Sequence, residues 1–244
     1  MLINRFYALT GNYYFGIAEP DVMPFVLHVL QPGDLFVDIG ANGGAYTVLA
    51  SAEKGAKTVA IEAEPETFKG LVKNIELNKL NDLVEAWPVA VSDVNGNLPF
   101  TNSEHASNWI CFEDRPDIIN VEAKMLDTIL NGKIPTVIKM DIEGYEHNAL
   151  LGAHHSISND GCKALVLEFS NNGEYYGYGN KVTHQLLTQY GFKPYRYHYK
   201  TKSLESFDPL TTGFNINMIY IKDIAFIQQR LDTANHILMS GEYI

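Results

Sequence analysis

Short apolar runs alternate with helical patterns of apolar residues over most of the chain. Five apolar runs have the length and composition of buried strands, and they lie at residues 35–39, 58–62, 84–91, 137–140 and 164–169. Helical spacing predicts helices at residues 21–30, 45–54, 65–77, 145–151 and 182–190. This alternation is typical of successive βαβ units, so the sequence predicts an α/β fold built on a parallel sheet.

The C-terminal part of the chain departs from this alternation. Residues 193–199 and 217–222 predict a final pair of strands, and residues 225–239 predict a C-terminal helix. We expect a single domain over residues 1–244. Its core spans about residues 19–222, with an N-terminal helical segment and the C-terminal helix appended. The C-terminal helix either covers this domain or forms the contact of a homodimer.

Two segments, residues 95–121 and 170–180, lack a clear periodic pattern. Long segments of this kind either form ordinary surface connections or shape a binding site. Their polar and aromatic residues suit a sugar or aromatic ligand, and they are His105, Asn108, Trp109, Tyr175, Tyr176 and Tyr178. The same side chains can instead pack the segments onto the domain, so both interpretations stay open.

The composition narrows the range of partners and compartments. The chain has 18 Lys and Arg against 29 Asp and Glu, and a surface with a net charge of −11 repels the phosphates of nucleic acids. Two cysteines are too few for a disulfide framework and fit a reducing compartment. No apolar run reaches the length of a membrane helix, and residues 1–8 lack a signal-peptide pattern. We therefore expect a cytoplasmic protein that binds neither nucleic acid nor membranes.

The strongest local signal is a glycine turn after the first predicted strand, with the sequence Phe36-Val37-Asp38-Ile39-Gly40-Ala41-Asn42-Gly43-Gly44. Ligands of open parallel sheets bind beyond the carboxyl ends of the strands, where glycine lets the backbone approach closely. Glu62 ends the second strand about 20 residues later, and a carboxylate at this place can accept both ribose hydroxyls of an adenosine ligand. Together the two features predict a cofactor that contains adenosine.

The spacing within the turn separates the candidate cofactors. A dinucleotide fingerprint requires Gly-x-Gly-x-x-Gly, but Asn42 and Ala45 stand at its second and third glycine positions. Asp38 favours a ligand with a positive amino group over a diphosphate. S-adenosylmethionine carries an ammonium and a sulfonium group and no phosphate, so it is the cofactor that the turn favours.

These segments resemble the FkbM-type methyltransferases, a branch of the class I S-adenosylmethionine-dependent enzymes. The resemblance spans about residues 19–222. Its motifs are Val37 to Gly44, Glu62, Ala90-Val91-Ser92-Asp93, Leu126-Asp127-Thr128 and Lys139-Met140-Asp141-Ile142-Glu143-Gly144-Tyr145-Glu146. The last motif is the most specific, because nearly all class I methyltransferases share the glycine turn. The resemblance implies a Rossmann-like sheet of seven strands with helices on both faces, whose last strand runs antiparallel.

The resemblance also implies roles for single residues. Gly40 and Asn42 line the methionine part of the cofactor, Glu62 holds the ribose, and Ser92 borders the adenine. Asp141 lies at the end of the fourth strand beside the transferable methyl group. The predicted cofactor-binding residues are therefore Asp38, Gly40, Asn42, Gly43, Glu62, Ser92 and Asp141. Members of this family often O-methylate sugars or other small metabolites, so the implied acceptor is a small molecule such as a sugar.

The residues after the fourth strand supply candidate bases. Methyl transfer from a sulfonium needs mainly alignment, and an alcohol acceptor also benefits from a base that takes its proton. The predicted catalytic residues are Asp141, Glu143 and His147, and His105 is a second candidate base. Glu143 and Glu146 can instead stabilise the dipole of the following helix, and His147 can be a solvated helix residue. The role of Asp141 stays open between positioning, base and metal ligand.

Other sites and functions remain as alternatives. The main prediction has no metal, but Asp141, Glu168 and Asn171 have the oxygen donors of a Mg²⁺ site. The chain can also be a binding protein that kept the fold and lost catalysis, or a dinucleotide-dependent oxidoreductase. The intact glycine turn, Glu62 and Asp141 argue against the first of these, and the glycine spacing argues against the second.

Overall fold

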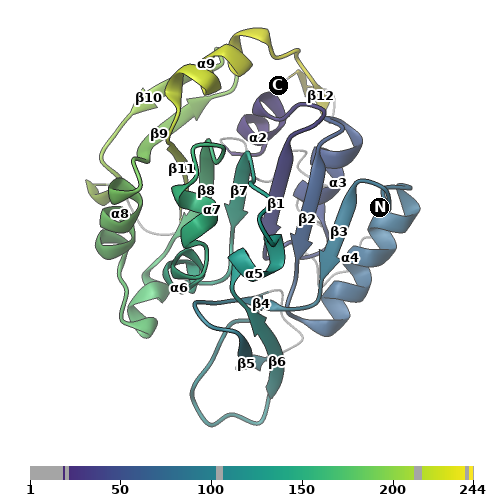
Figure 1. The fold of residues 1–244 in the computed structure, drawn as a ribbon, viewed down its shortest axis with the longest axis vertical. Helices are drawn as coiled ribbons and strands as arrows, with labels where there is room; N and C mark the ends of the chain where they lie inside the picture. The colour runs from purple at the N-terminus through teal and green to yellow at the C-terminus, as the bar shows by residue number, and fades with distance from the viewer. Residues whose placement is uncertain (1–18, 20–21, 103–106, 212–215, 240–241, 244) are drawn as a thin grey trace.

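A sheet of eight strands forms the centre of the protein (Figure 1). The computed structural model describes residues 19, 22–102, 107–211, 216–239 and 242–243. In spatial order the strands are β10 (Ser203–Ser206), β9 (Lys193–His198), β11 (Ile216–Ile221), β8 (Ala164–Phe169), β7 (Val137–Met140), β1 (Leu35–Ile39), β2 (Lys57–Ile61) and β3 (Val84–Trp87). The five strands from β8 to β3 pair in parallel, and β11 runs antiparallel to both β8 and β9.

This topology confirms the predicted Rossmann-like α/β fold. It contains the seven expected strands, with β11 as the antiparallel one, and adds β10 as an antiparallel edge strand beside β9. Every residue of β7 is buried, as expected for a parallel strand that is covered on both faces.

Helices cover both faces of the sheet. One face carries α2 (Met23–Val29), α3 (Ala45–Ala52), α4 (Pro65–Leu77) and α9 (Ile224–Thr233), and the other carries α5 (Leu126–Leu130), α6 (Glu146–Leu151), α7 (His154–Ser158) and α8 (Asn180–Gln189). Successive strand residues alternate between these layers, so Phe36 packs with α2 and Val37 packs on the opposite side. Within the described residues, no helix is long and apolar enough to cross a membrane.

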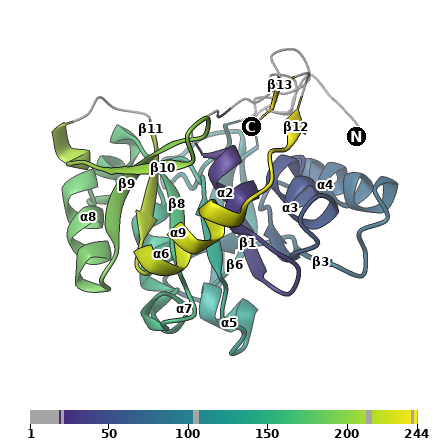
Figure 2. The same ribbon diagram turned by 90° about the horizontal axis from the view of Figure 1, so that it is seen from above.

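The C-terminal helix is shorter than predicted. Ala234 takes an extended conformation and ends α9 at Thr233, and residues 238–239 form the short strand β12 (Leu238–Met239), which pairs with β13 (Glu242–Tyr243). Ile227 and Leu231 of α9 are fully buried in the same cluster as the residues of α2. Figure 2 shows α9 lying beside α2, so this helix covers the domain.

A second, smaller sheet is the largest departure from the predicted elements. The predicted strand over residues 84–91 is split at Pro88, which cannot donate to a strand ladder. Its second part, β4 (Ala90–Val91), joins β6 (Ile118–Lys124) and β5 (Gly96–Thr101) in a three-stranded sheet. The two ends of the first segment without a periodic pattern are therefore strand, and this small sheet projects at one end of the main sheet (Figure 1).

Candidate active site

A cavity of about 210 Å³ opens where β1, β2 and β7 end. Its walls come from the glycine turn after β1, from the residues that follow β2 and β7, and from the small sheet. Four of the predicted cofactor-binding residues line it, namely Gly40, Asn42, Glu62 and Asp141. The cavity therefore lies at the edge of the sheet where α/β folds bind ligands.

The glycine turn passes unusually close to the end of β7. Gly40 has a φ of +73°, and a Cβ atom at this position would lie 1.9 Å from the backbone oxygen of Asp141. Asn42 also takes a left-handed conformation, with a φ of 51°, and its Oδ1 accepts a hydrogen bond from the N–H of Gly43 at 2.7 Å. Only glycine fits at residue 40, because any side chain would push the two strand ends apart.

Glu62 is held by backbone donors from the two loops that flank it. Its Oε2 accepts from the N–H of Asn42 at 2.9 Å, and its Oε1 accepts from the N–H of Glu64 at 2.9 Å. Burial raises the pKa of Glu62 to about 7, although these two hydrogen bonds act in the opposite direction. Each carboxylate oxygen can accept more than one hydrogen bond, so Glu62 can still bind hydroxyl groups in the cavity.

Asp38, Gly43 and Ser92 lie outside the wall of the cavity. Oδ2 of Asp38 accepts from the N–H and the hydroxyl of Thr47, at 3.1 and 2.6 Å, and so holds the first turn of α3. The hydroxyl of Ser92 is turned to Asp93, at 2.9 Å, in a fully buried position. The structure therefore places these three residues behind the cavity, where the side chains of Asp38 and Ser92 support the loops that line it.

An ion pair between Lys139 and Asp141 is a feature that the sequence-based assignment missed. Nζ of Lys139 lies 3.2 Å from Oδ2 of Asp141 and 4.9 Å from the centre of the Tyr46 ring. Burial alone lowers the pKa of Lys139, but the carboxylates of Asp141, Asp38 and Glu19 outweigh burial and raise it above its usual value. The overlooked signal is a lysine in an apolar strand two residues before an aspartate, because this spacing puts both side chains on the same face.

Glu19 and Tyr46 complete the wall beside this ion pair. The hydroxyl of Tyr46 donates to Oε2 of Glu19 at 2.5 Å, and Nδ2 of Asn217 donates to the same oxygen at 3.0 Å. Burial, followed by the charge of Glu19, raises the pKa of Tyr46 well above its usual value. The three residues are far apart in the sequence, so no local pattern indicated that they meet.

The two acidic residues after Asp141 have different surroundings. Glu143 is half-buried in the cavity wall with a φ of 57°. Burial and the charge of Asp141 raise its pKa, and a hydrogen bond with Ser107 counteracts them. Glu146 turns back instead, and its Oε1 accepts from the N–H groups of Ile142 at 3.0 Å and Gly144 at 3.3 Å. Burial raises the pKa of Glu146 to about 8.

Comparison with known proteins identifies the family of this domain. Residues 38–194 match the family model described as the methyltransferase FkbM domain. The chain belongs to the FkbM methyltransferase family. The match begins just before the glycine turn and ends in β9, so it includes Glu62, Asp141 and Glu143.

Two curated proteins are similar to parts of this FkbM-family chain. It is 25% identical over 144 residues to the hexuronic acid methyltransferase AglP of Haloferax volcanii, and the aligned residues make up 58% of this chain and 59% of AglP. It is 40% identical over 68 residues to a tRNA(Phe) (4-demethylwyosine(37)-C(7)) aminocarboxypropyltransferase of Pyrococcus horikoshii, and the aligned residues make up 28% of this chain and 24% of that protein. The matched region is thus less than two thirds of the length of either relative.

Two solved structures of low sequence identity are similar in fold to the FkbM-family chain. The precorrin-6y C5,15-methyltransferase of Geobacter metallireducens has a TM-score of 0.48 and 13% identity, with 84% of this chain and 89% of that chain covered. SMU.1697c of Streptococcus mutans, described as a putative methyltransferase in complex with SAH, has a TM-score of 0.46 and 9% identity, with 81% and 92% covered.

The structure does not bring His147 to the cavity of the FkbM-family domain. Its Nδ1 lies 3.1 Å from the hydroxyl of Thr183 on α8, and its ring stacks on Tyr178 with 4.0 Å between the ring centres. Burial lowers the pKa of His147. The histidine is therefore buried between α6 and α8, which corrects both the prediction of a base and the alternative of a solvated residue. His105 lies outside the described residues.

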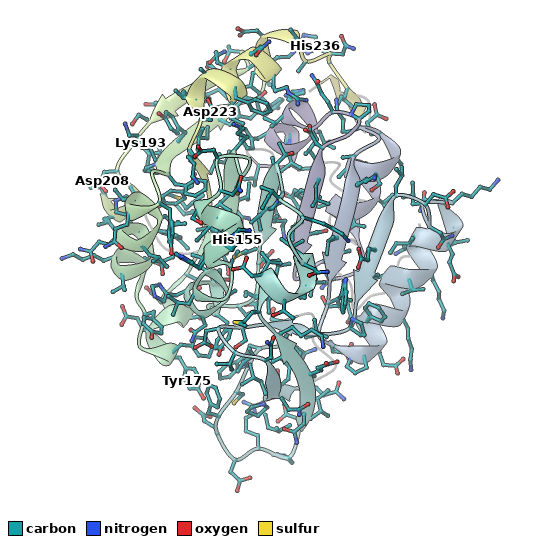
Figure 3. The ribbon with its side chains drawn as sticks, viewed as in Figure 1. His155, Tyr175, Lys193, Asp208, Asp223 and His236 are labelled. Carbon is teal, nitrogen blue, oxygen red and sulfur yellow. The ribbon has the colours of Figure 1, made fainter. Side chains whose placement is uncertain are left out.

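The aromatic residues of the two insertions mostly contact one another. Tyr175 lies beside the small sheet (Figure 3), and its hydroxyl accepts from the N–H of Phe112 at 2.9 Å. The ring of Trp109 packs edge-on against that of Tyr175, and the hydroxyl of Tyr176 donates to the backbone oxygen of Ile110 at 2.8 Å. These contacts support the packing interpretation for the aromatic residues, whereas Asn108 lines the cavity.

The residues of the alternative Mg²⁺ site do not form a recognisable ligand set. Among the described residues, no three His, Cys, Asp or Glu side chains are placed to hold a metal ion. Asn171 begins the 3-10 helix η1 (Asn171–Tyr176) and is exposed to solvent. Burial, followed by the charge of Asp141, raises the pKa of Glu168 to about 7.

Proposed function

We propose that this chain is an S-adenosylmethionine-dependent methyltransferase that methylates a hydroxyl group of a small metabolite or sugar. The observation that carries the proposal is one cavity that joins the glycine turn, the carboxylate of Glu62 and the carboxylate of Asp141. When bound, S-adenosylmethionine supplies a methyl group on a sulfonium whose sulfur leaves as a neutral thioether. The family membership and the similarity to a hexuronic acid methyltransferase support this reaction class.

The charges of the cavity fit this cofactor better than a dinucleotide. The acidic residues that line it are Glu19, Glu62, Glu64, Asp141 and Glu143, and Lys139 is the only Lys or Arg among the described lining residues. A negative wall attracts a ligand with a sulfonium and an ammonium group and repels a pyrophosphate. The close approach at Gly40 also provides a surface without a side chain over which a ligand can lie.

The two carboxylates near β7 support different roles in the proton transfer. Asp141 is paired with Lys139, whereas burial and the neighbouring charge of Asp141 raise the pKa of Glu143 and so make it a stronger base than an ordinary glutamate. We assign to Glu143 the removal of the proton from the acceptor hydroxyl, and to Asp141 a hydrogen bond that orients this hydroxyl.

Calorimetric titration with S-adenosylhomocysteine tests the cofactor site. We expect micromolar binding by the wild type and at least a tenfold loss, about 1.4 kcal/mol, in Glu62→Ala. Glu66→Ala is the matched control, because Glu66 is an exposed residue of α4 paired with Lys69, and it should bind like the wild type. No binding by the folded wild type, or displacement of the ligand by NAD, would contradict the proposal.

The by-product of turnover identifies the group that is transferred. Methyl transfer converts the cofactor to S-adenosylhomocysteine, whereas transfer of an aminocarboxypropyl group leaves methylthioadenosine. A panel of sugars and small alcohols, analysed by mass spectrometry for both by-products, should yield S-adenosylhomocysteine and an acceptor heavier by one methyl group. Methylthioadenosine would instead favour the chemistry in the name of the Pyrococcus horikoshii relative.

A further inference from the structure

We propose that Asn108, Ile110 and Phe112 form an acceptor row that holds an uncharged oligosaccharide, an inference that rests on the proposed function. Asn108 and Ile110 line the cavity, and Phe112 lies outside its wall. Phe112 is 59% exposed, more than any other large apolar side chain in the described part of the chain. Exposed apolar surface of this kind is typical of ligand-binding grooves and other interaction sites.

The backbone places the three side chains of the acceptor row on one face. Residues 109–111 pair antiparallel with β5, through hydrogen bonds of 3.0 Å on either side of the bridge between Phe100 and Ile110. The N–H of Phe112 then points away from β5, toward η1. This alternation of hydrogen bonds is that of an extended strand, in which side chains two residues apart share a face. Phe112 therefore continues the face on which Asn108 and Ile110 line the cavity.

Two tyrosines of η1 hold the outer edge of this strand. The hydroxyl of Tyr175 accepts from the N–H of Phe112 at 2.9 Å, and the hydroxyl of Tyr176 donates to the backbone oxygen of Ile110 at 2.8 Å. The strand is thus fixed by side-chain hydroxyls, while the ring of Phe112 stays exposed. A ligand that stacks on this ring meets a surface that is already in position.

The other end of the acceptor row lies at the proposed base. Glu143 has a hydrogen bond with Ser107, the residue before Asn108. Since a strand rises by about 3.3 Å per residue, Phe112 lies roughly 13 Å from Asn108. An acceptor with a hydroxyl at Glu143 and another part on Phe112 therefore extends over more than one sugar ring. The row fits a disaccharide or a longer oligosaccharide.

The charges around the acceptor row favour an uncharged sugar over a sugar acid. Residues 107–117 and 170–180, which the structure describes in full, have Arg115 as their only Lys or Arg. Its guanidinium is already paired with Asp117, through hydrogen bonds of 2.9 and 2.8 Å. The acidic residues of the two segments are Glu113, Asp114, Asp117 and Glu174. A carboxylate on the acceptor would be repelled here, whereas an aromatic ring suits the apolar face of a neutral sugar.

Methyl transfer to matched sugars tests the acceptor row. The neutral probes are glucose, galactose and mannose, with the disaccharides maltose, cellobiose, lactose and mannobiose. The charged probes are glucuronic acid, galacturonic acid and digalacturonic acid. We expect the wild type to methylate at least one neutral disaccharide with a kcat/KM at least tenfold above that for its monosaccharides and for every charged probe.

Phe112→Ala should reduce the preference for the disaccharide over the monosaccharide at least fivefold, through a higher KM for the disaccharide. Phe112→Tyr keeps an aromatic ring and should restore the preference. Leu77→Ala is the matched control, because Leu77 is a 58% exposed apolar residue of α4 outside the cavity, and it should retain the preference of the wild type. Calorimetry with S-adenosylhomocysteine verifies that each variant is folded.

The outcomes distinguish this inference from the proposed function. The same preference in the wild type and Phe112→Ala, faster transfer to the charged probes, or transfer only to alcohols that are not sugars would overturn the acceptor row and leave methyl transfer intact. Loss of a dimer in Phe112→Ala by sedimentation, with the preference unchanged, would overturn it in favour of a contact between two copies of the chain. Absence of S-adenosylhomocysteine binding by the wild type would overturn the proposed function and the acceptor row together.

Discussion

Two loops meet at the cavity and hold their carboxylates in different ways. In the loop between β2 and α4, Glu62 and Glu64 accept hydrogen bonds from backbone N–H groups, and Glu64 caps the first turn of α4. In the loop between β7 and α6, Asp141 pairs with the side chain of Lys139, and Glu143 bonds with Ser107 from the small sheet side. Backbone N–H groups of the glycine turn and of the loop itself hold Glu62, whereas the side chains of Lys139 and Ser107 are the partners of Asp141 and Glu143.

The kind of partner that holds each carboxylate fits its proposed role, which is ligand binding for Glu62 and proton transfer for Asp141 and Glu143. Backbone donors fix the position of Glu62 independently of distant side chains, which suits a constant contact with ribose. Lys139 pairs with Asp141, and burial and the charge of Asp141 raise the pKa of Glu143, which suits proton transfer at this loop. The following changes act on the contact between the glycine turn and the end of β7, and then on residues of the loop after β7 and of α6.

Replacement of Gly40 by alanine should have the largest effect, because Gly40 is the contact between the glycine turn and the end of β7. The added Cβ would collide with the backbone of Asp141 and would also occupy a left-handed conformation. We expect a loss of more than about 3 kcal/mol in unfolding free energy and no measurable binding of S-adenosylhomocysteine.

Gly33→Ala is the control for this change, since Gly33 has a φ of +94° and nothing within 4 Å of an added Cβ. It should cost only about 1 kcal/mol from backbone strain. Equal thermal unfolding midpoints for the two variants would show that the close approach at Gly40 is unimportant.

Glu146→Gln should change how stability depends on pH. The pKa of Glu146 is about 8 in the folded protein against 4.5 as its ordinary value, so the folded state holds the proton more tightly. The resulting stabilisation is complete below about pH 4.5 and is lost as the pH rises through 8. Glutamine keeps an acceptor for Ile142 and Gly144 and has no charge to bury.

The thermal unfolding midpoint of Glu146→Gln should therefore rise relative to that of the wild type between pH 5 and pH 8. We expect a relative gain of at least about 2 °C in the thermal midpoint. Parallel midpoint curves across this range would mean that Glu146 titrates in the folded protein as it does in the unfolded chain.

His147→Ala should have the smallest effect on turnover, because His147 faces Thr183 and Tyr178 and not the cavity. We expect less than a threefold change in kcat with the acceptor found in the panel, and a loss of about 1 kcal/mol in stability. Glu143→Gln, measured beside it, should lower kcat by roughly a hundredfold or more. A larger loss in His147→Ala than in Glu143→Gln would reverse the assignment of the base.

The sequence was sufficient for the parts of the site that depend on local order. Glu62 and Asp141 follow strands directly, and in a parallel sheet such positions meet at one edge, where both residues line the cavity. The contact of Glu19 with Tyr46 depends on how α3 packs, and no local pattern carries that information. His147 was misplaced because its orientation on α6 is decided by packing against α8.

The small sheet was missed for a different reason. Pro88 marked the end of β3, and the alternation of Val121 and Ala123 with polar residues is typical of a half-buried strand. Both signals are short and lie next to a segment without periodicity, which hid the pairing of β5 with β6.

The break at Pro88 also has a consequence for how the protein can change over time. The small sheet has its own ladder, in which β4 pairs with β6 at Ala90 with Ala123 and at Val91 with Lys124. Among the residues that the structure describes, it shares no ladder with the main sheet. We therefore expect that replacement of β5 and β6 leaves in place the strands that precede Glu62 and Asp141. The molecule is in this sense modular: the main sheet carries Glu62 and Asp141, and a separately paired sheet supplies another wall of the same cavity.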